Sequence, residues 1–188
     1  MTIARFKEPR KSSVGFAEAG HTREDLFLGA PARFRVISLA MNSPIQEDVS
    51  IVTVTTDEQI LQTRDVMREL RPGVPAEMYL ATVRRMMASD GYRLAAVAEQ
   101  GVVRAVAGYR YMEMLYCGKI LYVDDLNTDP RCRSKGYGKL LLDSLKKEAR
   151  ANGCRELHLD SGVQREQTHR FYFREGLTIN CYHFRVAL

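Results

Sequence analysis

The spacing of apolar and polar residues predicts alternating short strands and helices from about residue 51 to the end of the chain. Apolar residues three and four positions apart, such as Tyr79, Val83 and Met86, indicate an amphipathic helix. Short β-branched or alternating runs indicate strands. The expected strands are 51–55, 93–99, 102–112, 119–126, 156–160 and 178–187, and the expected helices are 57–70, 75–89, 135–151 and 164–175. This order predicts a mixed α/β fold, with parallel strands on either side of helix 135–151.

The first 48 residues follow a different pattern from the rest. They mix glycine, proline, serine and charged residues without a sustained helical or strand period. We therefore expect residues 1–48 to form an extension that is disordered or packed on the domain, and residues 49–188 to form one domain. Met41 is an alternative start, because the compact domain begins soon after it.

Composition narrows the class of protein. The chain has 188 residues, of which 45% are apolar and 27% charged, with a net charge of +5. It has no long apolar run, and its N-terminus is polar, so we expect a cytoplasmic protein without a membrane span. Most of the basic excess lies in the extension and forms no clustered stripe, so we do not expect nucleic-acid binding, although a basic extension that binds nucleic acid is an alternative to test.

The cysteines and histidines give no recognisable metal pattern. The four cysteines, Cys117, Cys132, Cys154 and Cys181, lack C-x-x-C spacing. We therefore expect reduced thiols and no metal site. His158, His169 and His183 are expected to be structural or surface residues.

The most informative motif is the turn that opens helix 135–151. It reads Arg-Ser-Lys-Gly-Tyr-Gly over residues 133–138. Glycines permit a tight turn and a close approach, and the backbone N–H groups of a helix N-terminus attract phosphate. No Gly-Lys-Ser/Thr sequence follows, and the three-glycine dinucleotide fingerprint is missing, so the turn is typical of neither a P-loop nor a Rossmann fold. The candidate ligand-binding residues here are Arg133, Ser134, Lys135, Gly136, Tyr137, Gly138 and Lys139.

Together with a second motif, this turn resembles that of the GCN5-related N-acetyltransferase (GNAT) superfamily. The second motif is Phe171-Tyr172-x-x-x-Gly176-Leu177, and the resemblance covers about residues 50–188. It implies an α/β GNAT fold: a mixed, mostly antiparallel sheet flanked by helices, with a parallel strand pair around the acyl-CoA-binding helix. It further implies acetyl-CoA as co-substrate, and a homodimer.

The resemblance also assigns roles to residues. It implies that Tyr172 protonates the departing thiolate, and that backbone groups of Leu126, Asn127 and Thr128 pair with the pantetheine arm. Many members have an asparagine seven residues before this tyrosine, where the present chain has Arg165. Arg165 is therefore a candidate cofactor contact of a different kind.

Asp124 and Asp125 are the candidate bases at the end of strand 119–126. An amine of pKa about 10.4 is neutral in about one molecule in 2,500 at pH 7, a penalty of about 4.6 kcal/mol, so a nearby carboxylate assists the reaction. Because side chains alternate along a strand, we expect the two carboxylates to face opposite sides, with at most one in the cleft. Similarity to family members that act on polyamines favours Asp124.

The resulting hypothesis is an acetyl-CoA-dependent N-acetyltransferase in which a primary amine attacks directly within a ternary complex. No cysteine has an adjacent base in the sequence, which argues against an acyl-enzyme. Two alternatives remain: a different acyl donor, or a non-catalytic domain that binds acyl-CoA. The sequence leaves the acceptor open among small amines, antibiotics, amino acids and protein amines.

Overall fold

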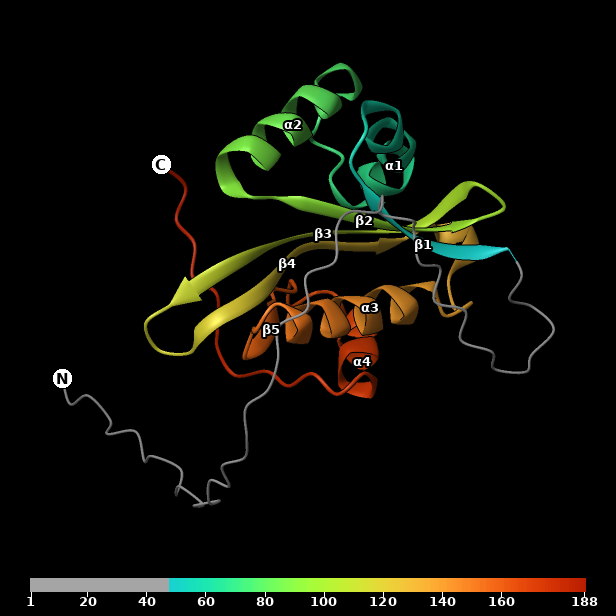
Figure 1. Cartoon of the computed structure of the whole chain (residues 1–188). Coiled ribbons are helices and arrows are strands. Elements are labelled where there is room, and N and C mark those ends of the chain that lie inside the picture. Colours follow the sequence, from blue (N-terminus) through green and yellow to red (C-terminus); the bar gives the residue numbers. More distant parts are fainter. Residues whose placement is uncertain (1–47) are drawn as a thin grey trace, which may run out of the picture. The chain divides into compact units, whose positions relative to one another are not determined.

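The computed structural model describes residues 48–188, which form a five-stranded sheet in the order β1-β2-β3-β4-β5 (Figure 1). Neighbouring strands are antiparallel except β4 and β5, which are parallel. The fold class predicted from the sequence is confirmed. Almost all of the predicted extension, residues 1–48, and the alternative start at Met41 lie outside the described residues.

The elements follow the predicted order closely. The strands are β1 (Val49–Val54), β2 (Arg93–Glu99), β3 (Val102–Met114), β4 (Gly118–Thr128) and β5 (Glu156–Leu159). The α-helices are α1 (Asp57–Leu70), α2 (Tyr79–Asp90), α3 (Tyr137–Ala151) and α4 (Glu166–Arg174), with short 3-10 turns η1 (Ala76–Met78) and η2 (Pro130–Cys132). None of the described helices is long and apolar enough to cross a bilayer.

Local sequence signals explain several boundaries. Thr56 caps α1 in a capping box with Gln59, whose side chain accepts a hydrogen bond from the Thr56 backbone N–H at 3.1 Å. Gln100 and Gly101 both have positive φ angles, +51° and +75°, and make the tight turn between β2 and β3. These signals are local, which is why the sequence pattern predicts them well.

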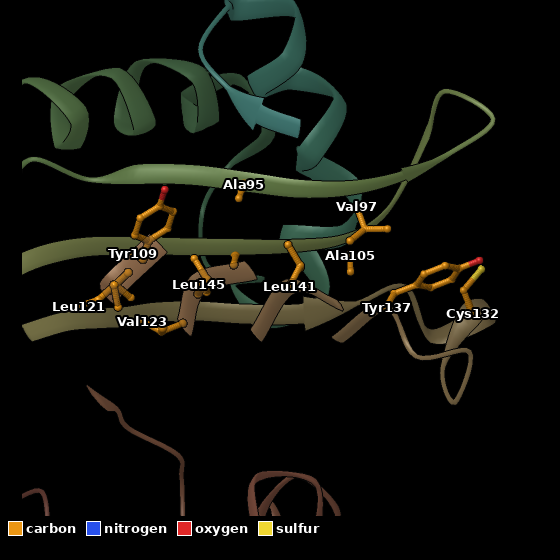
Figure 2. Packing of buried hydrophobic residues seen from close by; sticks show 12 residues of the cluster. Ala95, Val97, Ala105, Tyr109, Leu121, Val123, Cys132, Tyr137, Leu141 and Leu145 are labelled. Carbon is orange, nitrogen blue, oxygen red and sulfur yellow. The ribbon is translucent and has the colours of Figure 1, made fainter. Parts of the chain in front are cut away.

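The sheet has a hydrophobic core on each face. Helices α1 and α2 cover one face, and α3 and α4 the other (Figure 1). On the α3 face, Leu141 and Leu145 pack with Leu121 and Val123 of β4 (Figure 2). Tyr137 and Cys132 lie at one end of this cluster, where β4 leads into α3. The N-terminus of α3 is therefore fixed to the core next to the predicted phosphate-binding turn.

The predicted strand 178–187 is wrong. The structure has no strand there, and Ile179, Tyr182, Phe184 and Val186 are all more than 60% exposed. Alternation shows which side chains a strand would bury, but a strand also needs a neighbour that accepts its backbone hydrogen bonds. Within the described part of the chain this segment has no such neighbour.

An irregularity in β4 divides the strand into two parts. The register of β3 with β4 shifts, since Tyr109 pairs with Val123 but Gly108 pairs with Asp125, which leaves Asp124 as an extra, bulged residue. The parallel pairing of β4 with β5 ends at the same place, at Val123 and Leu159. Beyond this point, β4 continues to Thr128 along β3 alone among the described strands.

Candidate active site

Asp125 lies at the centre of a polar network at the bulge. It is only 6% exposed. Arg71 donates from Nε to Asp125 Oδ1 at 2.6 Å, and the Tyr92 hydroxyl donates to Oδ2 at 2.7 Å. Burial and the Asp125 charge raise the pKa of Tyr92, which keeps its hydroxyl protonated as a donor. Both carboxylate oxygens of Asp125 are therefore engaged by other side chains.

Asp124 belongs to the same network, which corrects the expectation that the two carboxylates face opposite sides. Arg110 donates from Nε to Asp124 Oδ2 at 2.9 Å, and the Arg110 guanidinium lies 6.0 Å from the centre of the Tyr92 ring. Arg71 also bonds the Asp124 carbonyl oxygen at 2.8 Å. The bulge interrupts strict alternation and so brings both acidic residues into one cluster.

The environment of Asp124 suits a base better than that of Asp125. Burial is the main cause of a raised Asp124 pKa, which the bond to Arg110 partly offsets. Its Oδ1 makes no hydrogen bond within residues 48–188, whereas both oxygens of Asp125 are occupied. Asp124 therefore retains a free carboxylate oxygen and an increased affinity for a proton.

Gly108 and Tyr92 belong to this network, and the sequence analysis missed them. A Cβ atom at Gly108 would lie 1.9 Å from the Tyr92 hydroxyl oxygen. The tyrosine therefore reaches Asp125 only by crossing the strand where there is no side chain. A glycine within the apolar run Ala105–Tyr109 is the signal for such a close approach.

The last residues of β4 expose their backbone on the side that β5 has left. Leu126, Asn127 and Thr128 are half-buried and remain paired with β3. Asn127 donates from Nδ2 to the Val66 carbonyl oxygen at 2.8 Å, which ties this end to α1. In a strand, alternate N–H and C=O groups face the two neighbours, so half of these groups are available to an extended ligand.

The turn after β4 has the backbone of an anion-binding loop. Ser134 and Gly136 have positive φ angles of +63° and +88°, and Gly136 is the residue before α3. Asp129 stabilises the entry to the turn by bonding both the backbone and the side chain of Arg131, and these bonds lower the Asp129 pKa to about 2. The exposed Arg133, Ser134 and Lys135 surround the N–H groups of the helix N-terminus.

Two candidates in this turn have side chains engaged elsewhere. The buried Tyr137 hydroxyl donates to Glu99, and this bond raises the Tyr137 pKa to about 12. Lys139 pairs with Asp143 at 2.9 Å and Glu175 at 3.0 Å. Both side chains therefore have partners within the protein, and a ligand would contact these two residues through their backbone N–H groups.

A groove of about 400 Å³ is lined by three of the candidate cofactor-binding residues, but not by Asp124 or Asp125. It is lined by the end of α1 at Glu69 and Leu70, by Asn127 and Arg133, and by residues 164–168 at the start of α4. It thus brings together Asn127, Arg133 and Arg165, which are far apart in the sequence. Arg133 and Arg165 offer two cations to a phosphate-bearing ligand, while Glu69 and Glu166 line the same groove with opposite charge.

Tyr172 lies on α4 but is not among the residues that line the groove. Burial raises the pKa of its hydroxyl, and the positive charge of Arg165 partly offsets this effect. Within residues 48–188 the hydroxyl has no hydrogen-bond partner, and its ring lies 5.5 Å from that of Phe171. Phe171 lies near Gly138, where a Cβ atom would be 3.6 Å from its ring, so α4 is packed on the first turn of α3.

A small cavity lies beside α1 and the segment that leads from it to α2. Its volume is about 20 Å³, and Arg64, Arg68 and Arg71 are among the residues that line it. This is room for about one water molecule.

Comparisons of the sequence with known proteins point to one family. Residues 61–176 match the model of the Acetyltransferase (GNAT) family. An uncharacterised N-acetyltransferase of Bacillus subtilis, YhdJ, is 38% identical over 133 residues, which cover 70% of this chain and 94% of the relative.

Solved structures share the fold at lower identity. An aminoglycoside N-acetyltransferase, AAC(6')-Iy in complex with CoA, superposes with a TM-score of 0.66 at 17% identity, covering 78% of this chain and all of that one. A Trypanosoma brucei acetyltransferase superposes with a TM-score of 0.64 at 22% identity, covering 75% of this chain and all of that one.

Proposed function

The chain belongs to the GNAT acetyltransferase family, and we propose that it transfers an acetyl group from acetyl-CoA to a primary amine by direct attack in a ternary complex. The observation that carries this proposal is the groove of about 400 Å³, which connects the end of β4, the turn before α3 and the start of α4. A solved structure of the same fold was obtained with CoA, which supports the choice of donor.

The residues present fit acetyl-CoA. In this proposal, backbone groups of Leu126, Asn127 and Thr128 pair with an extended pantetheine arm on the side of β4 that β5 has left. The N–H groups of residues 134–139 and the cation of Arg133 bind the pyrophosphate in this scheme, and the exposed Lys135 adds positive charge. Arg165 replaces the family's usual asparagine with a cation on the same groove. The bound thioester supplies the acetyl group and a thiolate leaving group.

The protein's own contribution to the chemistry is proton transfer and positioning. Asp124, with a raised pKa and one free oxygen, accepts the amine proton directly or through water. Asp125 orients Arg71 and Tyr92 and is a positioning residue in this scheme. Tyr172, protonated at neutral pH, donates its proton to the leaving thiolate. In this scheme the amine attacks the thioester directly, and no acyl-enzyme forms.

The acceptor is a primary amine, and the family relationship does not narrow it further. The structural neighbours include aminoglycoside acetyltransferases, one of them in complex with sisomicin. In this chain, Asp124 and Asp125 are paired with arginines, so the site lacks the free acidic cluster that a polycationic acceptor favours. The test is therefore a broad panel: aminoglycosides, polyamines, amino acids, arylalkylamines and lysine-containing peptides.

The decisive experiment combines this panel with Tyr172→Phe. With wild-type protein and acetyl-CoA, we expect release of free thiol with at least one amine. Tyr172→Phe should lower kcat by about 100-fold or more while the protein stays folded, because general acids contribute roughly 10²–10⁴-fold. Tyr122→Phe is the matched control. Tyr122 lies on β4 before the bulge, and its hydroxyl donates to Asp160 at 2.7 Å, so this variant also loses a tyrosine hydroxyl but leaves the proposed general acid in place.

The other outcomes point to the alternatives. Binding of acetyl-CoA with no acetylated product across the panel would favour a non-catalytic acyl-CoA-binding domain. Turnover with a longer acyl-CoA but not with acetyl-CoA would replace the donor. Turnover by Tyr172→Phe at the wild-type rate would overturn the role of Tyr172.

A further inference from the structure

A cluster of three metal-ligating side chains lies at the start of β4, at the opposite end of the strand from the groove. It consists of Cys117, immediately before β4, and of Glu156 and His158 on β5. One ligand atom from each residue lies within 4.8 Å of the other two. Sequence spacing indicated no metal site because these residues are far apart along the chain, and only the parallel pairing of β4 with β5 brings them together.

We propose that Cys117, Glu156 and His158 bind a zinc ion, which joins the start of β4 to the short edge strand β5. Thiolate, imidazole and carboxylate together are a ligand set that zinc prefers. The ligand atoms of a tetrahedral zinc ion are separated by roughly 3.3–3.6 Å, given bond lengths of about 2.0–2.3 Å. The observed spacing requires side-chain adjustments of about 1 Å, without movement of the strands.

The arrangement along β5 explains how two of the ligands converge. Glu156 and His158 are two residues apart and so project from the same face of the strand. They pair with Ile120 and Tyr122 of β4. His158 Nε2 already lies 2.6 Å from Glu156 Oε2, so both ligand atoms point to one place. Zinc binds cysteine as the thiolate, so its binding at this site would be accompanied by loss of the Cys117 thiol proton.

Burial is consistent with three protein ligands and one solvent-accessible position. Cys117 is 7% exposed, and the His158 side chain 17%, so both are held by surrounding structure. The Glu156 side chain is 50% exposed, which leaves an entry path for the ion and room for water as the fourth ligand. The carboxylate of Asp160, just after β5, contacts Tyr122 and His183 and adds negative charge nearby.

The role that follows is to stabilise the edge of the sheet. β5 has only four residues and pairs with one neighbour among the described strands. A metal ion that binds only the folded chain stabilises the folded state, and the stabilisation grows with the logarithm of the ratio of free metal concentration to Kd. At a free zinc concentration 100-fold above Kd, we expect the Tm to rise by roughly 5–10 °C.

The test uses the full chain, stripped with a chelator and titrated with Zn²⁺, and separately with Co²⁺ as a spectroscopic probe. We expect one site per chain, thiolate-to-cobalt charge-transfer absorption in the near ultraviolet, and the Tm increase with Zn²⁺. Cys117→Ser should abolish the charge-transfer band. His158→Gln should weaken binding at least tenfold, and Glu156→Gln, at a half-exposed position, should weaken it without risk to the fold.

Cys132→Ala is the matched thiol control, because this cysteine lies at the other end of β4, beside Tyr137 (Figure 2). It should bind zinc as wild type does. Binding that is equally strong in wild type, His158→Gln and Glu156→Gln would overturn the site. So would the lack of a thiolate–cobalt band in the wild-type protein.

Discussion

The two ends of β4 differ in how regular the sheet is, and their chemistry differs accordingly. From Ile120 to Val123, β4 is paired on both sides, and the side chains beside it form a compact cluster with β5. From Asp124 onward the strand bulges and β5 departs, and Asn127 of this part of β4 lines a groove. A regular ladder fixes side chains relative to each other, whereas an interrupted one leaves polar groups available for a substrate.

The largest effect is predicted for Gly108→Ala, which tests whether the bulged end of β4 depends on the contact between Tyr92 and Asp125. The added Cβ would lie 1.9 Å from the Tyr92 hydroxyl, so the buried ring must move and its bond to Asp125 must break. We expect the free energy of unfolding to fall by about 3–4 kcal/mol, from overpacking together with the lost hydrogen bond. Urea denaturation would measure it.

Gly73→Ala is the control for this substitution, because no atom lies within 4 Å of its added Cβ. It should leave stability within about 0.5 kcal/mol of wild type. Equal stability of Gly108→Ala and Gly73→Ala would show that the Tyr92–Asp125 contact does not hold the bulged end together.

The second prediction separates the two carboxylates. Asp124→Asn should lower kcat/KM by about 100-fold with little loss of stability, because it removes a base that makes one ion pair. Asp125→Asn should mainly lower stability, because it weakens the buried partner of Arg71 and Tyr92. Steady-state thiol release and urea denaturation of both variants would measure the two effects independently.

The pH profile sharpens the same distinction. A base acts when deprotonated, so wild-type kcat/KM should fall as the pH drops through the pKa of Asp124. Burial raises that pKa above its usual value of 3.8. This acidic limb should disappear in Asp124→Asn and persist in Asp125→Asn. The reverse pattern would exchange the two roles.

Sequence analysis predicted the turn at Arg133–Gly138 because its signals are local. Two glycines, a cation and a helical period lie within a short stretch, and the structure confirms the helix that they open. The Asp125 network could not be predicted in this way, because Tyr92, Gly108 and Arg71 come from three other segments. The bulge that unites the carboxylates is likewise a property of register, which the pattern of one strand does not contain.

The same reasoning accounts for the wrong strand at the C-terminus and for the side-chain cluster at β5 that sequence spacing did not reveal. Residues 178–187 alternate as a strand should, but alternation does not supply a neighbouring strand. Cysteine spacing indicated no metal ligands, yet pairing of β4 with β5 brings Cys117 to Glu156 and His158. Both cases depend on which strands become neighbours.

A third, smaller effect is predicted at the groove. Arg133→Ala should raise the KM for acetyl-CoA about tenfold with kcat nearly unchanged, because a phosphate contact contributes equally to ground state and transition state. Arg150→Ala is the matched control, since this exposed arginine lies in the last turn of α3, at the opposite end of the helix from the turn that contains Arg133. Initial rates at varied acetyl-CoA would measure both. An unchanged KM in Arg133→Ala would remove this residue from the binding site.

The smallest predicted effect concerns the acid stability of the turn that leads into α3. Hydrogen bonds from Arg131 lower the Asp129 pKa to about 2. A lowered folded-state pKa contributes stability above the unfolded value of about 3.9, and this contribution is lost as the pH falls toward 2. Because the Arg131 side chain is 81% exposed, solvent screening limits the contribution to about 1 kcal/mol. Urea denaturation between pH 5 and 2 should show this loss in wild type but not in Asp129→Asn, whereas Asp143→Asn on the exposed side of α3 should retain it. If Asp129→Asn loses stability with acid as steeply as wild type, other carboxylates, and not the entry to this turn, cause the acid sensitivity.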